Sequence, residues 1–333
     1  MSKSNLFLHI SRPFLLDVTL RDGGYLNDWN FKLKHIETAV KSAGKMGADI
    51  IEVGYLDDKP GLPLAASCPP KLLKFVKKLK FNSLIAAMVR PSVEKPGSVL
   101  QKRKEFIDLV RIPVDLRNTH FANNLSSYCI HHNIPFTFNL TSVSCYSLTE
   151  IQDAVESLNS DASAIYIADS RGALIPEEVK NIVDTIKRKW NGLVGYHAHN
   201  NLGLALKNTE EALRSGCDMI DGSLSGIGLG GRNLDLKLAV KAARKYRNNL
   251  PDYDPKINES EEHLGVAKPA DEMPVFYLSG ERNIKMEWVQ IMIEQLGVGT
   301  ASEIIMKIPR CTLFHHYELK EYIEKKYWDQ LIW

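Results

Sequence analysis

Short apolar runs alternate with longer segments of helical periodicity over the first three quarters of the chain. In residues 31–46, for example, apolar residues recur every three or four positions, and Gly47 then stops the pattern. The runs that predict strands are 14–20, 50–55, 84–88, part of 106–112, 135–140, 164–168, 193–196 and 219–221. The segments that predict helices are 31–46, 71–79, 116–132, 148–158, 177–190, 204–215 and 234–246. Strands that alternate with helices in this way predict an α/β fold with a parallel sheet.

Polar side chains gather where the predicted strands end, whereas the bodies of the strands are predicted to be apolar. These polar residues are Arg21, Asp22, Arg90, Thr141, Asp169, Ser170, His197 and His199. In a closed barrel of eight strand–helix pairs, the carboxyl ends of the strands share one face, which carries the active site. An open doubly wound sheet is the competing fold, but its Gly-x-Gly-x-x-Gly turn does not follow the first predicted strand. We therefore predict a (β/α)8 TIM barrel.

The alternation stops near residue 248. Residues 1–248 are predicted to form the catalytic barrel, and residues 249–333 a linker and a small C-terminal helical region, with helical spacing at 287–296, 301–308 and 316–327. This region is compatible with a cap over the barrel and with a contact to a second copy of the chain or to a partner enzyme. Its terminal aromatic residues suggest either a docking surface or ordinary packing; they are Tyr322, Tyr327, Trp328 and Trp333.

Composition and charge narrow the class of protein. The chain has 42 Lys and Arg against 40 Asp and Glu, and a net charge of +2 does not favour nucleic acid or an acidic membrane as a partner. No apolar run reaches the about 20 residues of a membrane span, and the N-terminus lacks the features of a signal peptide. The five cysteines include no Cys-x-x-Cys pair, which is typical of reduced thiols. We therefore expect a cytoplasmic protein.

His197 and His199 are predicted at the end of a strand, where residues two apart point to the same side. At about 3.3 Å per residue their Cα atoms lie about 6.6 Å apart, so both imidazoles can reach one metal ion. The pair alone is a weak signal, since either histidine can simply be hydrogen-bonded. Asp22 adds a carboxylate, and such a ligand set leaves positions open for substrate and water. The alternative is an ion pair between Asp22 and Arg21, which is awkward for neighbours on a strand unless the strand has already ended.

Five motifs along residues 14–245 resemble those of one enzyme family. They are Thr19-Leu20-Arg21-Asp22-Gly23, Ile51-Glu52-Val53-Gly54, Tyr166-Ile167-Ala168-Asp169-Ser170, His197-Ala198-His199-Asn200 and Gly226-Ile227-Gly228-Leu229-Gly230-Gly231-Arg232-Asn233. Together and in this order they resemble the metal-dependent aldolase and Claisen-lyase barrels, the DRE-TIM metallolyases. The third and fifth motifs look most like the 4-hydroxy-2-oxovalerate aldolase branch.

The resemblance implies a metal centre. Asp22, His197 and His199 would bind a divalent cation, Mn²⁺ or Mg²⁺, although the ligand set also suits Zn²⁺, Fe²⁺ or Co²⁺. Asn233 corresponds to a metal-coordinating asparagine of the lyase branch, and we place it with the substrate-binding residues.

The resemblance also implies a substrate side. Arg21 would contact the enolate oxygen, and Ser170 would lie near the carboxylate of an α-keto acid, with Asp169 and Thr141 as further substrate-binding candidates. Aldol cleavage to pyruvate passes through an enolate, which a chelated cation stabilises as a Lewis acid. A fixed guanidinium beside the same oxygen adds stabilisation where charge develops.

Two positions depart from the aldolase pattern. Tyr25 stands where the aldolases carry a histidine, the base, and a tyrosine with its usual pKa of about 10 is a poor base at neutral pH. Tyr25 is therefore a catalytic residue with a lowered pKa or only a hydrogen-bonding group, with water on the metal or His120 as the alternative base. Arg232 stands where the aldolase loop has glycine, and it is predicted either to bind an acidic or phosphorylated substrate or to pair with Asp235. The glycine-rich segment is compatible with a phosphate cradle and with a tight turn.

The leading prediction is a divalent-metal-dependent aldolase, a carbon–carbon lyase for α-keto acid and aldehyde substrates of the 4-hydroxy-2-oxo acid class. A Claisen-type acyltransferase or acyl-CoA lyase of the same superfamily is the alternative, and a metal-binding interaction protein is the non-enzyme alternative. A biotin-dependent carboxyltransferase is disfavoured because residues 109–113 lack its lysine. An iron oxygenase is disfavoured because such two-histidine sites usually lie on all-β folds.

Overall fold

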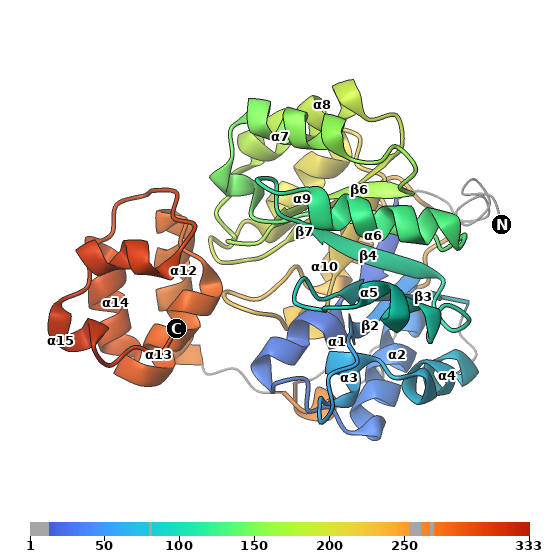
Figure 1. The fold of residues 1–333 in the computed structure, drawn as a ribbon, viewed down its shortest axis with the longest axis horizontal. Helices are drawn as coiled ribbons and strands as arrows, with labels where there is room; N and C mark the ends of the chain where they lie inside the picture. Colours follow the sequence, from blue (N-terminus) through green and yellow to red (C-terminus); the bar gives the residue numbers. More distant parts are fainter. Residues whose placement is uncertain (1–12, 80–81, 253–256, 258–260, 267–269) are drawn as a thin grey trace.

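The structure is a computed structural model that describes residues 13–79, 82–252, 257, 261–266 and 270–333. Eight strands pair in parallel in sequence order, and β8 pairs with β1 to close a barrel (Figure 1). The strands are β1 (Phe14–Asp17), β2 (Ile50–Leu56), β3 (Leu84–Val89), β4 (Leu109–Val114), β5 (Phe136–Leu140), β6 (Ala164–Asp169), β7 (Leu193–Ala198) and β8 (Met219–Gly222). The predicted TIM barrel is confirmed.

Helices cover the outside of the barrel and follow the strands in the predicted alternation. They are α1 (Thr19–Asp22), α2 (Leu33–Lys45), α3 (Leu64–Ser67), α4 (Pro70–Lys78), α5 (Pro96–Gln101), α6 (His120–His131), α7 (Leu148–Ser157), α8 (Pro176–Lys189), α9 (Ala205–Arg214) and α10 (Leu236–Ala243). Single 3-10 turns are η2 (Gly23–Leu26), η3 (Val143–Cys145) and η4 (Leu224–Gly226). Local chemistry sets several ends: at α7, Ser147 and Glu150 accept from each other's backbone N–H in a capping box. All seven predicted helices are present, and α1, α3 and α5 are additional.

The first strand is shorter than predicted and ends at Asp17, after which the chain turns at once into α1. The N–H of Asp22 donates to the carbonyl of Val18 at 2.8 Å. Gly24 permits the next turn, because a Cβ there would come within 2.0 Å of the Trp29 ring. The prediction of a strand through residue 20 is therefore wrong. Apolar periodicity does not report the side-chain packing that makes the chain turn here.

The barrel interior has an apolar layer near the amino ends of the strands. Its members are Phe14, Leu16, Val18, Ile50, Ala86, Leu109, Ala164, Tyr166 and Met219. Two residues further along β2, β4 and β8, and therefore on the same inward side, stand Glu52, Arg111 and Asp221, each at most 2 % exposed. Arg111 donates to Glu52 at 2.9 Å and to Asp221 at 2.8 Å, so these buried charges offset one another. The prediction of apolar strand bodies is wrong for these three strands.

The C-terminal helices form a unit beside the barrel, on the left in Figure 1. We call residues 273–333 the C-terminal cap; it contains α12 (Met273–Arg282), α13 (Met286–Leu296), α14 (Val298–Lys307), η6 (His316–Glu321) and α15 (Lys325–Trp328). It has a hydrophobic cluster of its own, against which Tyr322, Tyr327, Trp328 and Trp333 pack, each partly buried. This packing favours the ordinary interpretation of the terminal aromatic residues over a docking surface.

The predicted helices at 287–296 and 301–308 are confirmed, whereas 316–327 divides into η6 and α15, and α12 was not predicted. Two short helical pieces, α11 (Glu261–Leu264) and η5 (Ala270–Glu272), lie in the predicted linker, part of which falls outside the described residues. The division at residue 248 stays a prediction. Over the part of the chain that the structure describes, no helix is long and apolar enough to cross a membrane. All five cysteines are unpaired, and four of them are buried.

Candidate active site and metal centre

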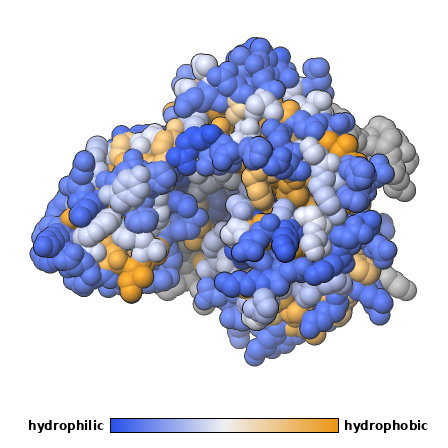
Figure 2. All heavy atoms as spheres, in the orientation of Figure 1, coloured by the Kyte–Doolittle hydropathy of each residue, from blue (hydrophilic) through white to orange (hydrophobic). Residues whose placement is uncertain are grey.

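A cavity of about 350 Å³ lies between the carboxyl ends of the strands and the C-terminal cap. Figure 2 shows a largely hydrophilic surface that is hollowed where the cap meets the barrel. The cap contributes Lys285, Met286, Glu287 and Phe314 to the lining, which no sequence signal anticipated. The predicted site residues in the lining are Arg21, Asp22, Tyr25, Thr141, Ser170, His197 and His199. The predicted residues at the ends of four strands, β1, β5, β6 and β7, thus reach one space.

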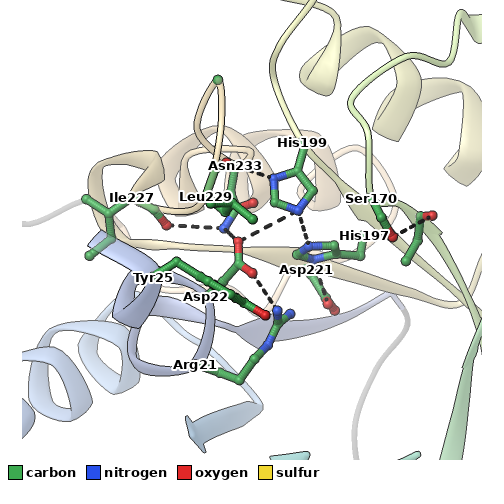
Figure 3. Close-up of polar contacts among 12 residues, drawn as sticks. Arg21, Asp22, Tyr25, Ser170, His197, His199, Asp221, Ile227, Leu229 and Asn233 are labelled. Atoms are coloured by element: carbon green, nitrogen blue, oxygen red, sulfur yellow. Dashed lines mark hydrogen bonds and ion pairs between the residues drawn. The ribbon is translucent and has the colours of Figure 1, made fainter. Parts of the chain in front are cut away.

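His197 near the end of β7 and His199 just beyond it turn their rings toward the carboxylate of Asp22 (Figure 3). The two Nε2 atoms are 3.3 Å apart, and Nε2 of His199 lies 3.8 Å from Oδ2 of Asp22. One ligand atom from each of the three residues lies within 4.8 Å of the others. Both histidines therefore face the same point, as a single divalent cation requires.

The other ring nitrogens hold the two imidazoles in place. Nδ1 of His197 lies 3.1 Å from Oδ2 of Asp221, and Nδ1 of His199 lies 3.2 Å from the carbonyl oxygen of Leu229. Each of these acceptors calls for a proton on Nδ1, which leaves a lone pair on Nε2 facing Asp22. Such contacts are typical of histidines that bind a metal, because they fix both the tautomer and the ring orientation.

The protonation states also suit a cation. Burial lowers the pKa of His199 to about 3, so its ring is neutral at neutral pH. Burial alone would raise the pKa of Asp22, but Arg21 and then the two histidines lower it to about 2. Metal ions bind neutral imidazole and ionised carboxylate. Two nitrogen lone pairs at 3.3 Å repel each other unless a proton or a cation lies between them, so the donor set fits a divalent cation.

Asn233 stands at the end of the glycine-rich loop, beside this cluster. Its Nδ2 donates to Oδ2 of Asp22 at 2.6 Å and to the carbonyl of Ile227 at 3.1 Å. Its Oδ1 is buried and has no hydrogen-bond partner among the described residues. Asn233 therefore steadies Asp22 and leaves an amide oxygen for another donor or a cation.

Two glycines let this loop approach the cluster. A Cβ on Gly228 would lie 2.6 Å from Oδ2 of Asp22, and a Cβ on Gly231 would lie 2.5 Å from the backbone of Asn201. The N–H of Gly231 already donates to the Asn201 side chain at 2.8 Å. The loop therefore fits the tight-turn interpretation better than the phosphate cradle.

Arg21 is held by two carboxylates and is only 7 % exposed. Its Nη1 donates to Oδ1 of Asp22 at 2.5 Å, and its Nε donates to Glu52 at 3.0 Å. This ion pair forms because the strand has ended before Arg21, so that both neighbours stand on the short helix α1. Asp22 uses Oδ1 for Arg21 and turns Oδ2 to His199, so the ion pair and a ligand role are compatible.

Arg111 links Arg21 to His197 through carboxylate oxygens that it shares with each of them. The Glu52 oxygen that accepts from Arg21 also accepts from Arg111, and the Asp221 oxygen that faces His197 accepts from Arg111 as well. Sequence reasoning missed this network. Its signal was a charged residue two positions after an apolar one within each of three predicted strands.

Tyr25 lies at the cavity with its hydroxyl 3.0 Å from that of Tyr55 and its ring edge-on to Trp29. Burial raises the pKa of Tyr25 well above its usual value, so the phenol stays protonated at neutral pH. This direction disfavours the alternative in which a lowered pKa makes Tyr25 a base, because the charge of Arg21 does not outweigh burial.

Ser170 and Thr141 line the cavity just beyond the ends of β6 and β5. The Thr141 hydroxyl donates to the carbonyl of Val114 at 2.9 Å. The Ser170 hydroxyl accepts from the N–H of Ser142 at 2.9 Å, while its own proton has only a 3.4 Å contact to Ala168. Ser170 is therefore the freer hydrogen-bond donor of the two.

Four residues considered for the site lie outside the cavity lining, namely Asn233, described above, and three others. Asp169 accepts from the N–H groups of Ala173 and Leu174, because strand alternation turns Ala168 and Ser170 inward and Asp169 outward. Its substrate-binding role is therefore not supported. The other two are Arg232, which donates to the carbonyl of Ser225 at 3.3 Å, and His120, which is exposed at the start of α6 and contacts Asn124.

Comparisons with known proteins agree with this geometry. The HMGL-like family matches residues 128–261. The 4-hydroxy-2-oxovalerate aldolase of Chloroflexus aggregans is 30% identical over 235 residues, which cover 68% of this chain and 67% of the relative. The enzyme of the same name from Thermomicrobium roseum is 29% identical over 252 residues, which cover 71% of this chain and 68% of the relative.

Solved structures share the fold. The N-terminal domain of an aldolase candidate from Bacteroides vulgatus is 25% identical, with a TM-score of 0.67 over 85% of this chain and 98% of that domain. The carboxyl transferase domain of Rhizobium etli pyruvate carboxylase has a TM-score of 0.65 over 90% of this chain and 56% of that chain. At 16% identity, the second likeness concerns the barrel fold alone.

Proposed function

The chain belongs to the HMGL-like family, the DRE-TIM metallolyases, and from this premise we propose that its cavity binds a 4-hydroxy-2-oxo acid and makes or cleaves its C–C bond through a pyruvate-type enolate. Within the family it is a metal-dependent aldolase, a carbon–carbon lyase. The observation that carries the proposal is the convergence of Arg21 with Asp22, His197 and His199 on one cavity. A Claisen-type acyltransferase has less support, because the relatives are named aldolases.

Asp22, His197 and His199 would hold the cation, for which we propose Mn²⁺ or Mg²⁺, and the amide oxygen of Asn233 is available beside them. When bound, the cation supplies Lewis-acid polarisation of the keto acid. Asp221 and Leu229 hold the Nδ1 atoms of His197 and His199, and this would keep both Nε2 atoms oriented toward the cation.

Arg21 would stabilise the enolate oxygen. Glu52 binds its Nε and Asp22 binds its Nη1, so the guanidinium plane is fixed before substrate arrives. Among the hydrogen bonds of the described residues none uses Nη2, which leaves that nitrogen to donate into the cavity. A donor fixed in advance needs no reorganisation when negative charge develops on the substrate.

Tyr25 and Ser170 would act as hydrogen-bond donors. Because its pKa is raised, Tyr25 keeps its proton and can donate it in a hydrogen bond to the hydroxyl or carbonyl oxygen of the aldehyde part. Ser170 would donate to the carboxylate of the keto acid. Neither group removes a proton, so the base is another group than Tyr25, and His120 is too far out to serve.

Exchange of the methyl protons of pyruvate tests the proposal without any aldehyde. In D₂O with Mn²⁺, the protein should deuterate pyruvate, which ¹H NMR follows as loss of the methyl signal. His199→Ala should abolish exchange, whereas His120→Gln, which changes an exposed histidine outside the cavity, should not. Metal binding by the wild-type protein without exchange would reject the enolate mechanism and support a metal-binding interaction protein.

A further inference from the structure

The cavity is lined by four cationic side chains, three of which have carboxylate partners. Arg21 is paired with Asp22, Arg117 donates to the two oxygens of Asp115 at 3.2 and 3.1 Å, and Lys285 lies 3.7 Å from Glu287. The fourth cation is Arg171, which directly follows Ser170 at the end of β6. Among the described residues no carboxylate forms an ion pair with it.

Arg171 is 2 % exposed, and its hydrogen-bond partners among the described residues are neutral. Nη1 and Nη2 donate to the carbonyl oxygens of Asn283 and Leu313, both in the C-terminal cap. Nε is buried without a hydrogen-bond partner in the described structure. Burial lowers the pKa of Arg171, and nearby groups that include Glu287 offset this effect only in part.

A role as a tether between barrel and cap does not account for this charge. Two backbone carbonyls need hydrogen-bond donors, which a neutral amide side chain also supplies. A guanidinium costs more to bury than an amide unless an anion offsets it. The two carbonyls do fix the plane of the guanidinium, and this leaves its remaining N–H groups oriented for a further acceptor.

We propose that Arg171 binds an anionic group, a carboxylate or a phosphate, at the end of the aldehyde partner that points away from the metal centre. The inference rests on the proposed function. The keto acid must lie at the metal ligands, at the strand ends, whereas the guanidinium lies where the barrel meets the cap. Arg171 and the metal ligands line the same cavity of about 350 Å³.

Matched aldehydes test the inference in the condensation direction, with pyruvate and Mn²⁺. D-glyceraldehyde 3-phosphate is compared with D-glyceraldehyde, and succinic semialdehyde with butanal. We expect kcat/KM to be higher for the charged member of at least one pair, and the pair that shows the preference identifies phosphate or carboxylate. Arg171→Met should lower the charged-to-neutral ratio by about 10- to 100-fold, as expected for a lost charge-assisted hydrogen bond. Arg171→Lys should retain part of the preference.

The neutral aldehyde is the internal reference for damage to the fold. Arg117→Gln is the matched control, because it removes a cavity cation that Asp115 already neutralises, and it should change the ratio less than about threefold. Equal turnover or no turnover of the charged aldehydes by the wild-type protein overturns the inference. An equal fall for charged and neutral aldehydes in Arg171→Met also overturns it and leaves Arg171 as a tether. Pyruvate deuteration without aldehyde reports separately on the proposed function.

Discussion

Arg21 and Arg171 are buried at the same cavity, 7 % and 2 % exposed, but their surroundings differ. Arg21, on the barrel side, lies between Asp22 and Glu52. Arg171, on the cap side, has backbone carbonyls as its hydrogen-bond partners. The guanidinium on the barrel side therefore has its counter-charges before substrate binds. The guanidinium on the cap side lacks an ion-pair partner among the described residues, and an anionic group of the substrate can supply one.

Two buried aspartates show the same contrast from the acidic side. Asp22 has a guanidinium partner, and its pKa falls to about 2. Asp169 has backbone N–H donors but no ion-pair partner in the described part of the chain, and burial raises its pKa to about 7. Both lie on the barrel, so the neighbouring charge rather than depth decides the direction of the shift.

The largest effect is expected on metal affinity when one of the proposed metal ligands is removed. The purified protein should bind about one divalent ion per chain, and His199→Ala should lose most of that affinity, because two remaining ligands do not offset dehydration of the ion. Metal analysis after dialysis measures this. Unchanged metal content in both Asp22→Ala and His197→Ala would contradict the assignment.

Replacing Arg111 by a neutral residue should destabilise the buried carboxylates of Glu52 and Asp221. Arg111→Met leaves Glu52 and Asp221 buried without their partner, and we expect a loss of about 3–5 kcal/mol in the free energy of unfolding. Urea unfolding measures this. Leu109→Ala in the apolar layer of the same strand should cost about 2–5 kcal/mol and leave pyruvate exchange nearly intact in the folded protein. If Arg111→Met behaves like Leu109→Ala in both assays, the network does not support the site.

The fixed geometry of Arg21 is tested by a substitution that keeps its charge. Arg21→Lys should retain the metal but lose on the order of 10²-fold in turnover, because lysine lacks the rigid fork that Glu52 and Asp22 orient. The rate of pyruvate exchange and the metal content are measured on the same sample. A normal exchange rate would make Arg21 a structural residue.

Asp169 is a buried carboxylate without an ion-pair partner among the described residues, and the pH dependence of the protein's stability tests its effect. Its folded pKa, about 7, is raised above the usual value of 3.8, so its contribution to stability is full below pH 3.8 and is lost as the pH rises through 7. Between pH 5 and pH 8 the wild-type protein should lose about 3 kcal/mol through this group. Asp169→Asn should lack that loss, as urea unfolding at the two pH values will show. An identical pH dependence in both proteins would mean that Asp169 has an effective counter-charge.

The smallest expected effect is at Tyr25. Tyr25→Phe removes one hydrogen-bond donor and should slow turnover or raise KM by roughly tenfold, while the lower limb of the pH–rate profile stays in place. Steady-state kinetics over a range of pH measures both. A loss above about 10³-fold together with disappearance of that limb would identify Tyr25 as the base.

The sequence by itself determined the barrel, its catalytic face and the grouping of the main residues. Strand and helix periodicities are local properties, and in a parallel barrel the end of every strand reaches the same face. The two-residue spacing of His197 and His199 therefore sufficed to predict that both rings point one way. The Arg21-Asp22 pair lay close enough to a strand end to be assigned to the same face.

Only the tertiary structure decided how charge is distributed around that face. Glu52, Arg111 and Asp221 meet because barrel closure brings together residues as far apart in sequence as Arg111 and Asp221, which are 110 positions apart. Asp169 turns outward because the register of β6 places Ser170 inward, and Arg171 is buried because the cap folds back over the strand ends. A pattern of apolar and polar positions records which residues avoid water, but the partners of buried charges depend on contacts between distant segments.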